Sequence, residues 1–238
     1  MKTPKVEKKK PFKFLTEGLF GALIAALIIR QFLVQAYTIP TASMEKTLLI
    51  GDFLLVNKFN YGMRTPDWIG IPYTDIGFDV PWFRFPALKE VQPYDVIIFR
   101  YPKNPMVDYI KRCIAVGGQT VEIIDKVVFV DGKPFPKPPK MQFVDPNIYK
   151  RNQGRFIFPT FMNLGSRDNY GPITIPEGKF WAMGDNRDNS ADSRVWGFVP
   201  HENIVGQALI IYFSWDSHPP LSQFFKKIRF DRIGWVIR

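Results

Sequence analysis

The residue best suited to nucleophilic chemistry in this sequence is Ser43, in the stretch Tyr37–Phe53 that follows a long apolar segment. Thr41 and Ala42 before it are small, and Pro40 fixes φ ahead of them, so the main chain can present the hydroxyl at the mouth of a cleft. A serine hydroxyl attacks only after a base has removed its proton. Without such a base, Ser43 would be interpreted as a turn hydroxyl with a local backbone hydrogen bond.

The expected base is Lys111, within the segment Asp108–Val116. This segment has the pattern of a strand in which Tyr109, Lys111 and Cys113 share one face. If that face is buried, desolvation lowers the lysine pKa, and a fall from about 10.4 to about 7.4–8.4 makes the amine a usable base near neutral pH. The alternative interpretation is a surface lysine on an amphipathic strand.

A third polar signal is the loop 184–194, with the sequence GDNRDNSADSR, which is dense in short hydrogen-bonding side chains. Ion pairs between Asp192 and Arg194, or between Asp185 and Arg187, could tie this loop together. Such pairs are compatible with catalysis nearby.

These segments resemble, in the same order, the sequence boxes of bacterial type I signal peptidases. The matching residues are Ser43-Met44 with Thr47-Leu48, Tyr-Ile-Lys-Arg at 109–112, the loop 184–194 with the following WGFVP, and Asp95–Phe99. The resemblance extends from about Arg30 to Gly206. It implies a serine endopeptidase anchored in the cytoplasmic (inner) membrane of a bacterium, which removes N-terminal signal peptides from secreted preproteins after small residues, at an A-x-A-like site.

The same resemblance implies roles for individual residues. Ser43 is the nucleophile, and Lys111 is the general base that later protonates the leaving amine. The Ser43 N–H and the Thr41 hydroxyl form the oxyanion hole. Ser190 hydrogen-bonds the lysine ammonium, and the pair Asp192 and Arg194 braces the site.

Two substrate pockets are implied in the same way. A small pocket for the residue before the cut is lined by Ile39, Pro40, Met44, Leu48, Tyr109 and Ile110, and a neighbouring shallow pocket by Tyr37, Ile39, Asp108 and Ile110. One residue departs from the family pattern Ser-Met-x-Pro-Thr-Leu, because Lys46 replaces the proline. We expect this change to loosen the turn after Ser43 and to leave the serine–lysine pair intact.

Two other functions compete with this one. A thiol protease would pair Cys113 with His201 or His218, but the sequence around Cys113 lacks cysteine-protease signatures, and a lone cysteine on a strand is more often buried. An anchored binding module or an inactive relative would account for Lys46. It would not account for the presence of the implied nucleophile, base and supporting serine together.

The formal net charge of +10 over 238 residues would suit nucleic acid or an anionic membrane surface. Its distribution favours the membrane, because six lysines fall within Met1–Lys13 and the sequence shows no nucleic-acid-binding motif. Two histidines and one cysteine make a zinc site improbable, and Ser193 and Val199 stand where a calcium loop needs glycine and glutamate. We therefore expect a monomer that uses no metal, cofactor or nucleic acid.

The N-terminal part predicts a single anchor. We expect a basic cytoplasmic segment at 1–14, a transmembrane helix at 15–36 and an extracytoplasmic (periplasmic) catalytic domain at 37–238. A cleavable secretory signal that ends at Val34-Gln35-Ala36 is the alternative. Arg30 and Gln31 inside the apolar segment favour an anchor that is retained.

The rest of the sequence predicts a mainly β fold, an antiparallel sheet assembly with long loops. Short runs of β-branched or aromatic residues are bounded by turn residues, and no helical pattern of comparable length follows Tyr37. Tight reversals are expected at Gly117-Gly118 and Asp131-Gly132. The expected strands are Phe53–Val56, Val96–Phe99, Asp108–Val116, Val121–Ile124, Val127–Val130 and Ala208–Phe213.

Two loop insertions are expected in this body, near 65–89 and 133–172. The aromatic residues of the first could form a small core beneath the loop or lie in the membrane interface. They are Trp68, Tyr73, Phe78, Trp82, Phe83 and Phe85. A second group with the composition for lipid contact lies near the C-terminus and comprises Phe224, Phe225, Lys226, Lys227, Arg229 and Trp235.

Overall fold

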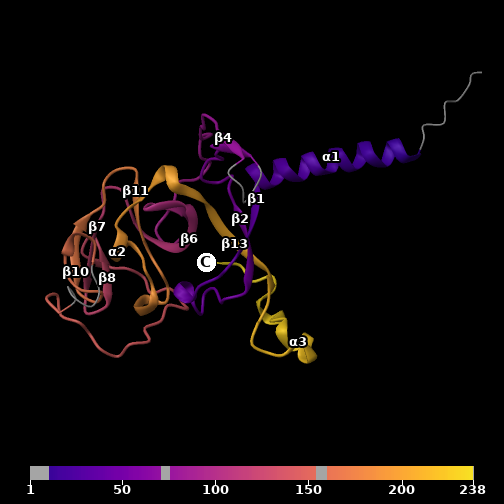
Figure 1. Ribbon diagram of the computed structural model, residues 1–238. Coiled ribbons are helices and arrows are strands. Elements are labelled where there is room, and N and C mark those ends of the chain that lie inside the picture. The colour runs from indigo at the N-terminus through magenta and orange to yellow at the C-terminus, as the bar shows by residue number, and fades with distance from the viewer. Residues whose placement is uncertain (1–10, 71–75, 154–159, 238) are drawn as a thin grey trace, which may run out of the picture.

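The strands of the chain form antiparallel sheets, as the sequence predicts. The computed structural model describes residues 11–70, 76–153 and 160–237 (Figure 1). Over these residues the strands build a seven-stranded, a four-stranded and a two-stranded sheet. The expected strands are all present, with boundaries that differ by a few residues.

The seven-stranded sheet carries the serine and the lysine. Its central strands are β-branched and buried on both faces, as in β5, where Val96, Ile97 and Ile98 are at most 3 % exposed. Every neighbouring pair of strands is antiparallel. In spatial order the strands are β1 (Val34–Thr38), β2 (Asp52–Asn57), β13 (Ile204–Ser214), β5 (Val96–Tyr101), β6 (Asn104–Val116), β11 (Lys179–Met183) and β12 (Val199–Pro200).

The four-stranded sheet follows β6 in the chain and forms a second lobe. Its order is β10 (Tyr170–Thr174), β7 (Thr120–Ile124), β8 (Val127–Val130) and β9 (Lys133–Pro134). The chain enters this sheet through the expected turn at Gly117-Gly118. The reversal at Asp131-Gly132 is also confirmed, with φ of 50° and 73°, values that asparagine, aspartate and glycine tolerate best.

The core is divided between the two lobes. One cluster of buried residues packs β2, β5 and β13 against the segment after β1, and a second lies under β5, β6 and β11. A third joins β7, β8 and β10 to Trp181 and Met183 of β11. The two sheets are therefore held together by hydrophobic packing along β11.

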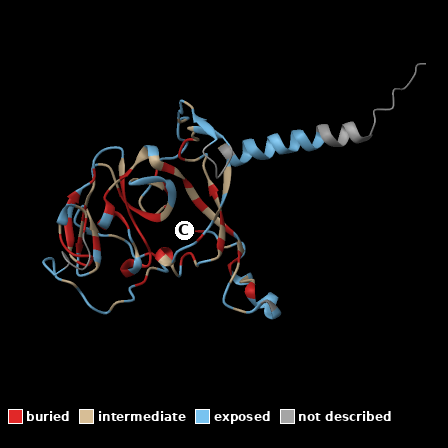
Figure 2. Ribbon diagram, viewed as in Figure 1, coloured by how far each residue is buried: buried red, intermediate tan, exposed pale blue. Residues whose placement is uncertain are grey.

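Helix α1 (Pro11–Phe32) projects away from the sheets, and its described side chains from Gly18 to Arg30 are exposed (Figure 2). The expected helix at 15–36 is wrong at its C-terminal end. There Val34–Thr38 forms β1 and pairs with β2, because Val, Tyr and Thr favour a strand that can be paired. Within the described residues, no helix has both the length and the apolar character needed to cross a membrane. Of the basic segment expected at 1–14, residues 1–10 lie outside the described residues.

The other helices are short, which agrees with the prediction that no long helix follows Tyr37. In the described part of the chain beyond that residue, no helix exceeds four residues. The α-helices are α2 (Ser193–Trp196) and α3 (Phe224–Lys227). The 3₁₀ helices are η1 (Ala42–Met44), η2 (Phe161–Asn163), η3 (Arg187–Asn189), η4 (His201–Asn203), η5 (Leu221–Gln223) and η6 (Phe230–Arg232).

The first loop insertion contains a small hairpin of β3 (Trp68–Gly70) and β4 (Gly77–Asp79), which lies near the base of α1 (Figure 1). Its aromatic residues do not form a buried core. Trp68, Phe78, Trp82, Phe83 and Phe85 are all exposed, while Tyr73 lies outside the described residues. Exposed rings favour the interpretation as an interaction surface over that of a core beneath the loop.

The C-terminal residues expected to contact lipid differ among themselves. Phe224 and Phe225 are exposed, but Lys227 is buried and donates to the carbonyl of Ser217. Trp235 is half-buried, because it packs against the cluster of β2, β5 and β13. The expectation that the whole group faces lipid is therefore wrong.

Candidate active site

Ser43 and Lys111 are hydrogen-bonded to each other. Lys111 Nζ lies 2.7 Å from Ser43 Oγ, and Nζ also donates to the carbonyl of Ile110 at 2.9 Å. The serine is 8 % exposed and the lysine 4 % exposed, so the pair is largely removed from water. The structure thus brings together two residues that are 68 positions apart in the sequence.

Burial is the main cause that lowers the pKa of Lys111 to about 8, against the smaller opposing effects of Asp192 and Asp185. Among the described residues no carboxylate contacts Nζ, whose partners are the Ser43 hydroxyl and the Ile110 carbonyl. A lysine in such surroundings can lose its proton near neutral pH. Its neutral amine then accepts a hydrogen bond from the Ser43 hydroxyl, the arrangement that general-base activation requires.

Local packing fixes the position of Ser43. The residue lies in η1, between β1 and β2, and the next residue, Met44, is fully buried together with Leu48. Lys46, which replaces the family's proline, has a φ of 69°. Proline is restricted to φ near −65°, so the turn after Ser43 takes a conformation here that the usual proline could not adopt.

The loop 184–194 holds the main chain around Ser43. The N–H of Asn186 donates to the Ser43 carbonyl at 3.1 Å, and Asn186 Nδ2 donates to the Ala42 carbonyl at 3.1 Å. The Thr47 hydroxyl donates to Asp185 Oδ2 at 2.6 Å. Three bonds therefore fasten the segment that carries the serine to one loop. The sequence analysis assigned no such role to Asn186 or Asp185, and the density of short polar side chains was the only signal for it.

The ion pairs of this loop are only partly those that the sequence suggested. The pair between Asp192 and Arg194 is present at 2.8 Å and buried, and Asp192 also accepts from the N–H of Gly184. Asp185, however, pairs with Arg112 at 2.6 Å and not with Arg187. Because Arg112 neighbours Lys111 on β6, this pair connects the strand that carries Lys111 to the loop that holds Ser43.

Ser190 lies close to the main chain of Ser43 without bonding to Lys111. A Cβ added at Gly184 would lie 2.3 Å from Ser190 Oγ and 2.4 Å from the Ser43 carbonyl oxygen, so both groups crowd that glycine. Ser190 Oγ is buried and makes no hydrogen bond to Lys111 in this structure. The expected hydrogen bond from Ser190 to the lysine ammonium is therefore absent from this structure. The supporting role of Ser190 stays a prediction.

Thr41 is exposed and immediately precedes η1, and its side chain does not cap that helix. This position leaves the hydroxyl available to a bound molecule beside Ser43. The oxyanion-hole role of Thr41 remains a prediction.

The residues expected to line the substrate pockets are divided between the two clusters of the large sheet and its exposed surface. Ile39, Met44 and Leu48 are buried in the cluster against which Tyr37 and Ile110 pack. Tyr109 packs against the other cluster of the large sheet, with its ring 5.3 Å from Lys111 Nζ. Pro40 and Asp108 are exposed. For the shallow pocket, the structure brings Tyr37 and Asp108 together, with a hydrogen bond of 2.8 Å from the Tyr37 hydroxyl.

The alternative thiol protease is not supported by the position of its cysteine. Cys113 is fully buried, and burial raises the pKa of its thiol, which opposes the thiolate that such chemistry needs. His201 packs on Phe180, and the side chain of His218 is 92 % exposed beside Asp216. Neither histidine contacts the cysteine.

Comparisons with known proteins identify the family of this chain. The family model described as signal peptidase, peptidase S26, matches residues 14–215. The signal peptidase I of Aquifex aeolicus is 38% identical over an alignment that covers 82% of this chain and 82% of that protein. The signal peptidases I of Pseudomonas fluorescens and Pseudomonas aeruginosa are 34% and 35% identical, over 97% and 92% of this chain and 82% and 78% of theirs.

A crystal structure of a signal peptidase I from Enterococcus faecalis, 28% identical, aligns with 50% of this chain and 97% of its own length at a TM-score of 0.38. The family match covers most of the chain, including all of the site described above. The chain belongs to the signal peptidase family, peptidase S26.

Proposed function

We propose that this protein is a signal peptidase I that cuts peptide bonds with Ser43 as nucleophile and Lys111 as general base. The observation that carries the proposal is the 2.7 Å contact between Lys111 Nζ and Ser43 Oγ, in a setting that lowers the lysine pKa to about 8. Its proposed substrates are preproteins, from which it removes the N-terminal signal peptide after small residues at an A-x-A-like site.

The proposed reaction has two stages. The neutral Lys111 amine takes the Ser43 proton while Oγ attacks the scissile carbonyl, and the resulting ammonium then protonates the leaving amine. The serine ester that remains is hydrolysed by water, which Lys111 activates in the same way. The Ser43 N–H and the Thr41 hydroxyl donate to the carbonyl oxygen as it becomes negatively charged, where one donor is worth about 2.7–4 kcal/mol.

Substrate binding is proposed on the side of β6 and η1 where Tyr37 and Asp108 meet. Asp108 and the end of β6 are exposed, so an extended peptide can reach the serine from this side. Ile39, Met44 and Leu48 are already packed in the core, so they set the floor and the size of a pocket more than they form its open wall. A shallow floor of this kind accepts small side chains and excludes large ones.

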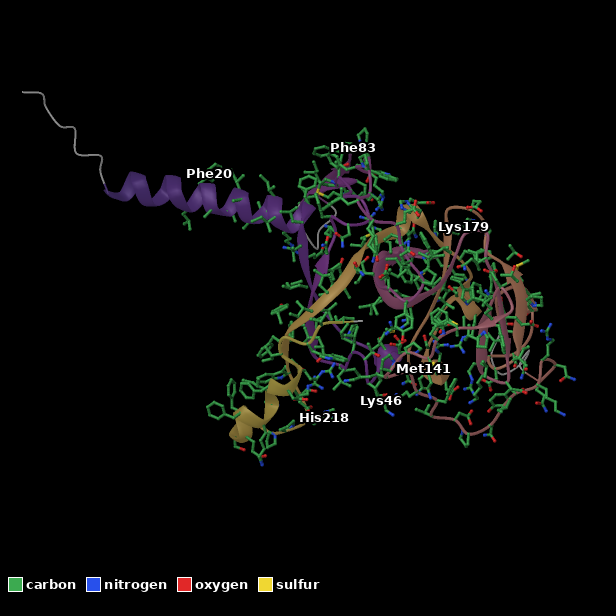
Figure 3. The ribbon with its side chains drawn as sticks, turned by 180° about the vertical axis from the view of Figure 1, so that it is seen from behind. Phe20, Lys46, Phe83, Met141, Lys179 and His218 are labelled. Carbon is green, nitrogen blue, oxygen red and sulfur yellow. The ribbon has the colours of Figure 1, made fainter. Side chains whose placement is uncertain are left out.

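We also propose that helix α1 (Pro11–Phe32) attaches the protein to the inner membrane, with the N-terminus in the cytoplasm and the sheets in the periplasm. The support is the apolar sequence itself and the exposed side chains of Leu19, Phe20 and Leu23 on a helix that projects from the body (Figure 3). Protease added to spheroplasts should digest the sheets and leave the N-terminal lysines protected. Protection of the sheets would show the reverse orientation.

Cleavage of a purified preprotein tests the proposed activity. The full chain should release the mature protein with a new N-terminus directly after an A-x-A site, as read by mass spectrometry. Ser43→Ala should release none. Cleavage by Ser43→Ala at the wild-type rate would contradict the proposal.

A further inference from the structure

A pocket of about 230 Å³ lies beside the four-stranded sheet, and neither Ser43 nor Lys111 lines it. It opens between β8, the segment that follows β9, and Arg187 of η3. Most of its wall is apolar, and two lysines bring positive charge to it. The apolar wall includes Val128, Phe135, Met141 and Phe143, and the two lysines are Lys126 and Lys137.

Arg187 is the unusual member of this lining. The residue is 2 % exposed, yet Nε and Nη2 of its guanidinium are buried without a hydrogen-bond partner. The other buried arginines of the site are held by carboxylates, Arg112 by Asp185 and Arg194 by Asp192. A buried cation without a partner is costly, and pairing with an anion removes most of that cost.

The neighbouring acidic residue does not supply the missing anion. Asp188 adjoins Arg187 in the sequence, but its carboxylate is shared between Lys126 at 3.3 Å and Arg167 at 3.3 Å. It also accepts the backbone N–H groups of Val144 and Asp145. Burial, and after it the charge of Arg194, lowers the pKa of Arg187 to about 10, so the guanidinium stays charged at neutral pH. The charges of Asp185 and Asp192 oppose this lowering, but no described residue forms a hydrogen bond with Nε or Nη2 of Arg187.

We infer that this pocket is a binding site for a carboxylate carried on a short apolar stem, with Arg187 as the residue that holds the carboxylate. A guanidinium offers parallel N–H donors that match the two oxygens of a carboxylate. The apolar wall would bury the stem. At about 230 Å³ the pocket is smaller than the roughly 300–1,000 Å³ of sites for drug-sized molecules, so it suits a short chain or a single acidic side chain.

The pocket is connected to the catalytic serine through the main chain. The Arg187 N–H donates to the Gln142 carbonyl at 3.0 Å, and the preceding residue, Asn186, donates to the Ser43 carbonyl. Gln142 itself reaches Glu45, two residues after Ser43, at 3.1 Å. Figure 3 labels Met141 and Lys46, the sequence neighbours of Gln142 and Glu45. A ligand that fixes Arg187 therefore acts on a segment that also holds Ser43.

The test is to titrate the full chain carrying Ser43→Ala with increasing hexanoate. Calorimetry and NMR of the ¹³C-labelled carboxylate measure the binding. This variant cannot cut by the proposed mechanism, so the result does not depend on the proposed function. Hexanoate should bind at one saturable site, and hexan-1-ol and hexylamine should not. Arg187→Gln should weaken hexanoate binding by about tenfold or more, because a bond to a charged group is lost. Lys137→Gln, at the rim, should weaken it by less than about threefold.

A second variant keeps the test decisive if Arg187→Gln does not fold. Met141→Trp fills the apolar wall without touching the charge, and it should abolish hexanoate binding. A capped Leu-Glu dipeptide, titrated in parallel, distinguishes a fatty acid from an acidic peptide as the natural source of the carboxylate, and binding of either supports the site. Three results would overturn the inference. The first is no saturable binding of hexanoate or the dipeptide, which would mean that water alone solvates Arg187. The others are equal binding of hexanoate and hexan-1-ol, and hexanoate binding that neither variant weakens.

Discussion

Two buried polar regions meet in this protein, and they differ in whether a carboxylate pairs with their positively charged side chains. At the Ser43–Lys111 pair, the lysine contacts a hydroxyl and a carbonyl, and burial lowers its pKa to about 8. In the loop 184–194 and its partner strand, Arg112 and Arg194 are each clamped by an aspartate. The two regions are only one residue apart on β6, where Lys111 precedes Arg112.

The difference shows how one strand can carry both a reactive and a structural cation. A buried ammonium without a carboxylate partner gives up its proton, which is what a base needs. A buried guanidinium with a carboxylate partner remains charged and fixes the elements that it joins. The clamped region therefore fixes the elements that it joins, and we propose that the unclamped Ser43–Lys111 pair is the one that reacts.

The largest effect should follow from breaking the reactive pair. Ser43→Ala and Lys111→Ala should each lower kcat/KM for preprotein cleavage by about 10⁴-fold or more, because nucleophile and base act as one unit. The double variant should be no slower than either single variant. The measurement is single-turnover cleavage, with circular dichroism to establish that the sheets are intact. Turnover by Lys111→Ala near the wild-type rate would rule out the lysine as the base.

Breaking the clamped region should affect stability first. Asp185→Asn leaves Arg112, which is 1 % exposed, buried without its charged partner, and should lower the free energy of unfolding by about 3–5 kcal/mol. Urea denaturation at pH 7 measures it. Asp216→Asn is the matched control, because its partner His218 is 92 % exposed, and it should change stability by less than about 0.5 kcal/mol. Equal effects of the two substitutions would remove the distinction between clamp and surface pair.

The oxyanion hole should contribute to rate without contributing to stability. Thr41→Val removes a hydroxyl that is exposed in the free protein, and it should lower kcat by about 10²–10³-fold with little change in KM. Thr41→Ser keeps the hydroxyl and serves as the control. If valine and serine gave the same kcat, the developing charge would be stabilised by another donor.

Much of this comparison was predictable from sequence. The mainly β fold was predictable, because strands such as the one at Val96–Phe99 and turns such as the one at Asp131-Gly132 depend on local chemistry. The partners of the buried charges were not. Asp185 pairs with Arg112, 73 positions away, because the sheet brings β6 against β11, and sequence proximity suggested Arg187 instead.

The predicted C-terminal end of the N-terminal helix was wrong for a related reason. An apolar segment does not reveal where a helix gives way to a strand. Here that point is decided by β2, which pairs with Val34–Thr38. Likewise, no local signal in the sequence distinguishes the exposed Phe225 from the buried Lys227, because the difference depends on packing after β13.

The smallest effect expected concerns the exposed aromatic residues. A protein lacking residues 1–32, which keeps all of β1, should still bind anionic liposomes and should cut faster when lipid is present, because Trp82, Phe83 and Phe225 are exposed and bury apolar area at the interface. Co-sedimentation and a peptide-cleavage assay measure these effects. Replacing all three by serine should weaken the association. If the protein neither bound liposomes nor responded to lipid, these residues would have no role at the membrane.

The most direct test of the whole account is the pKa of Lys111 itself, read from the ¹³Cε and ¹⁵Nζ shifts of selectively labelled lysine, with Lys111→Arg to assign the signal. The account predicts about 8 in the folded protein, against an ordinary value of 10.5. Between these values the unfolded chain holds a proton that the folded chain has lost, so this group makes the free energy of unfolding rise with pH there. The rate of cleavage should rise through the same folded-state pKa. A Lys111 pKa near 10.5, with cleavage already at its maximum at pH 7, would contradict the account.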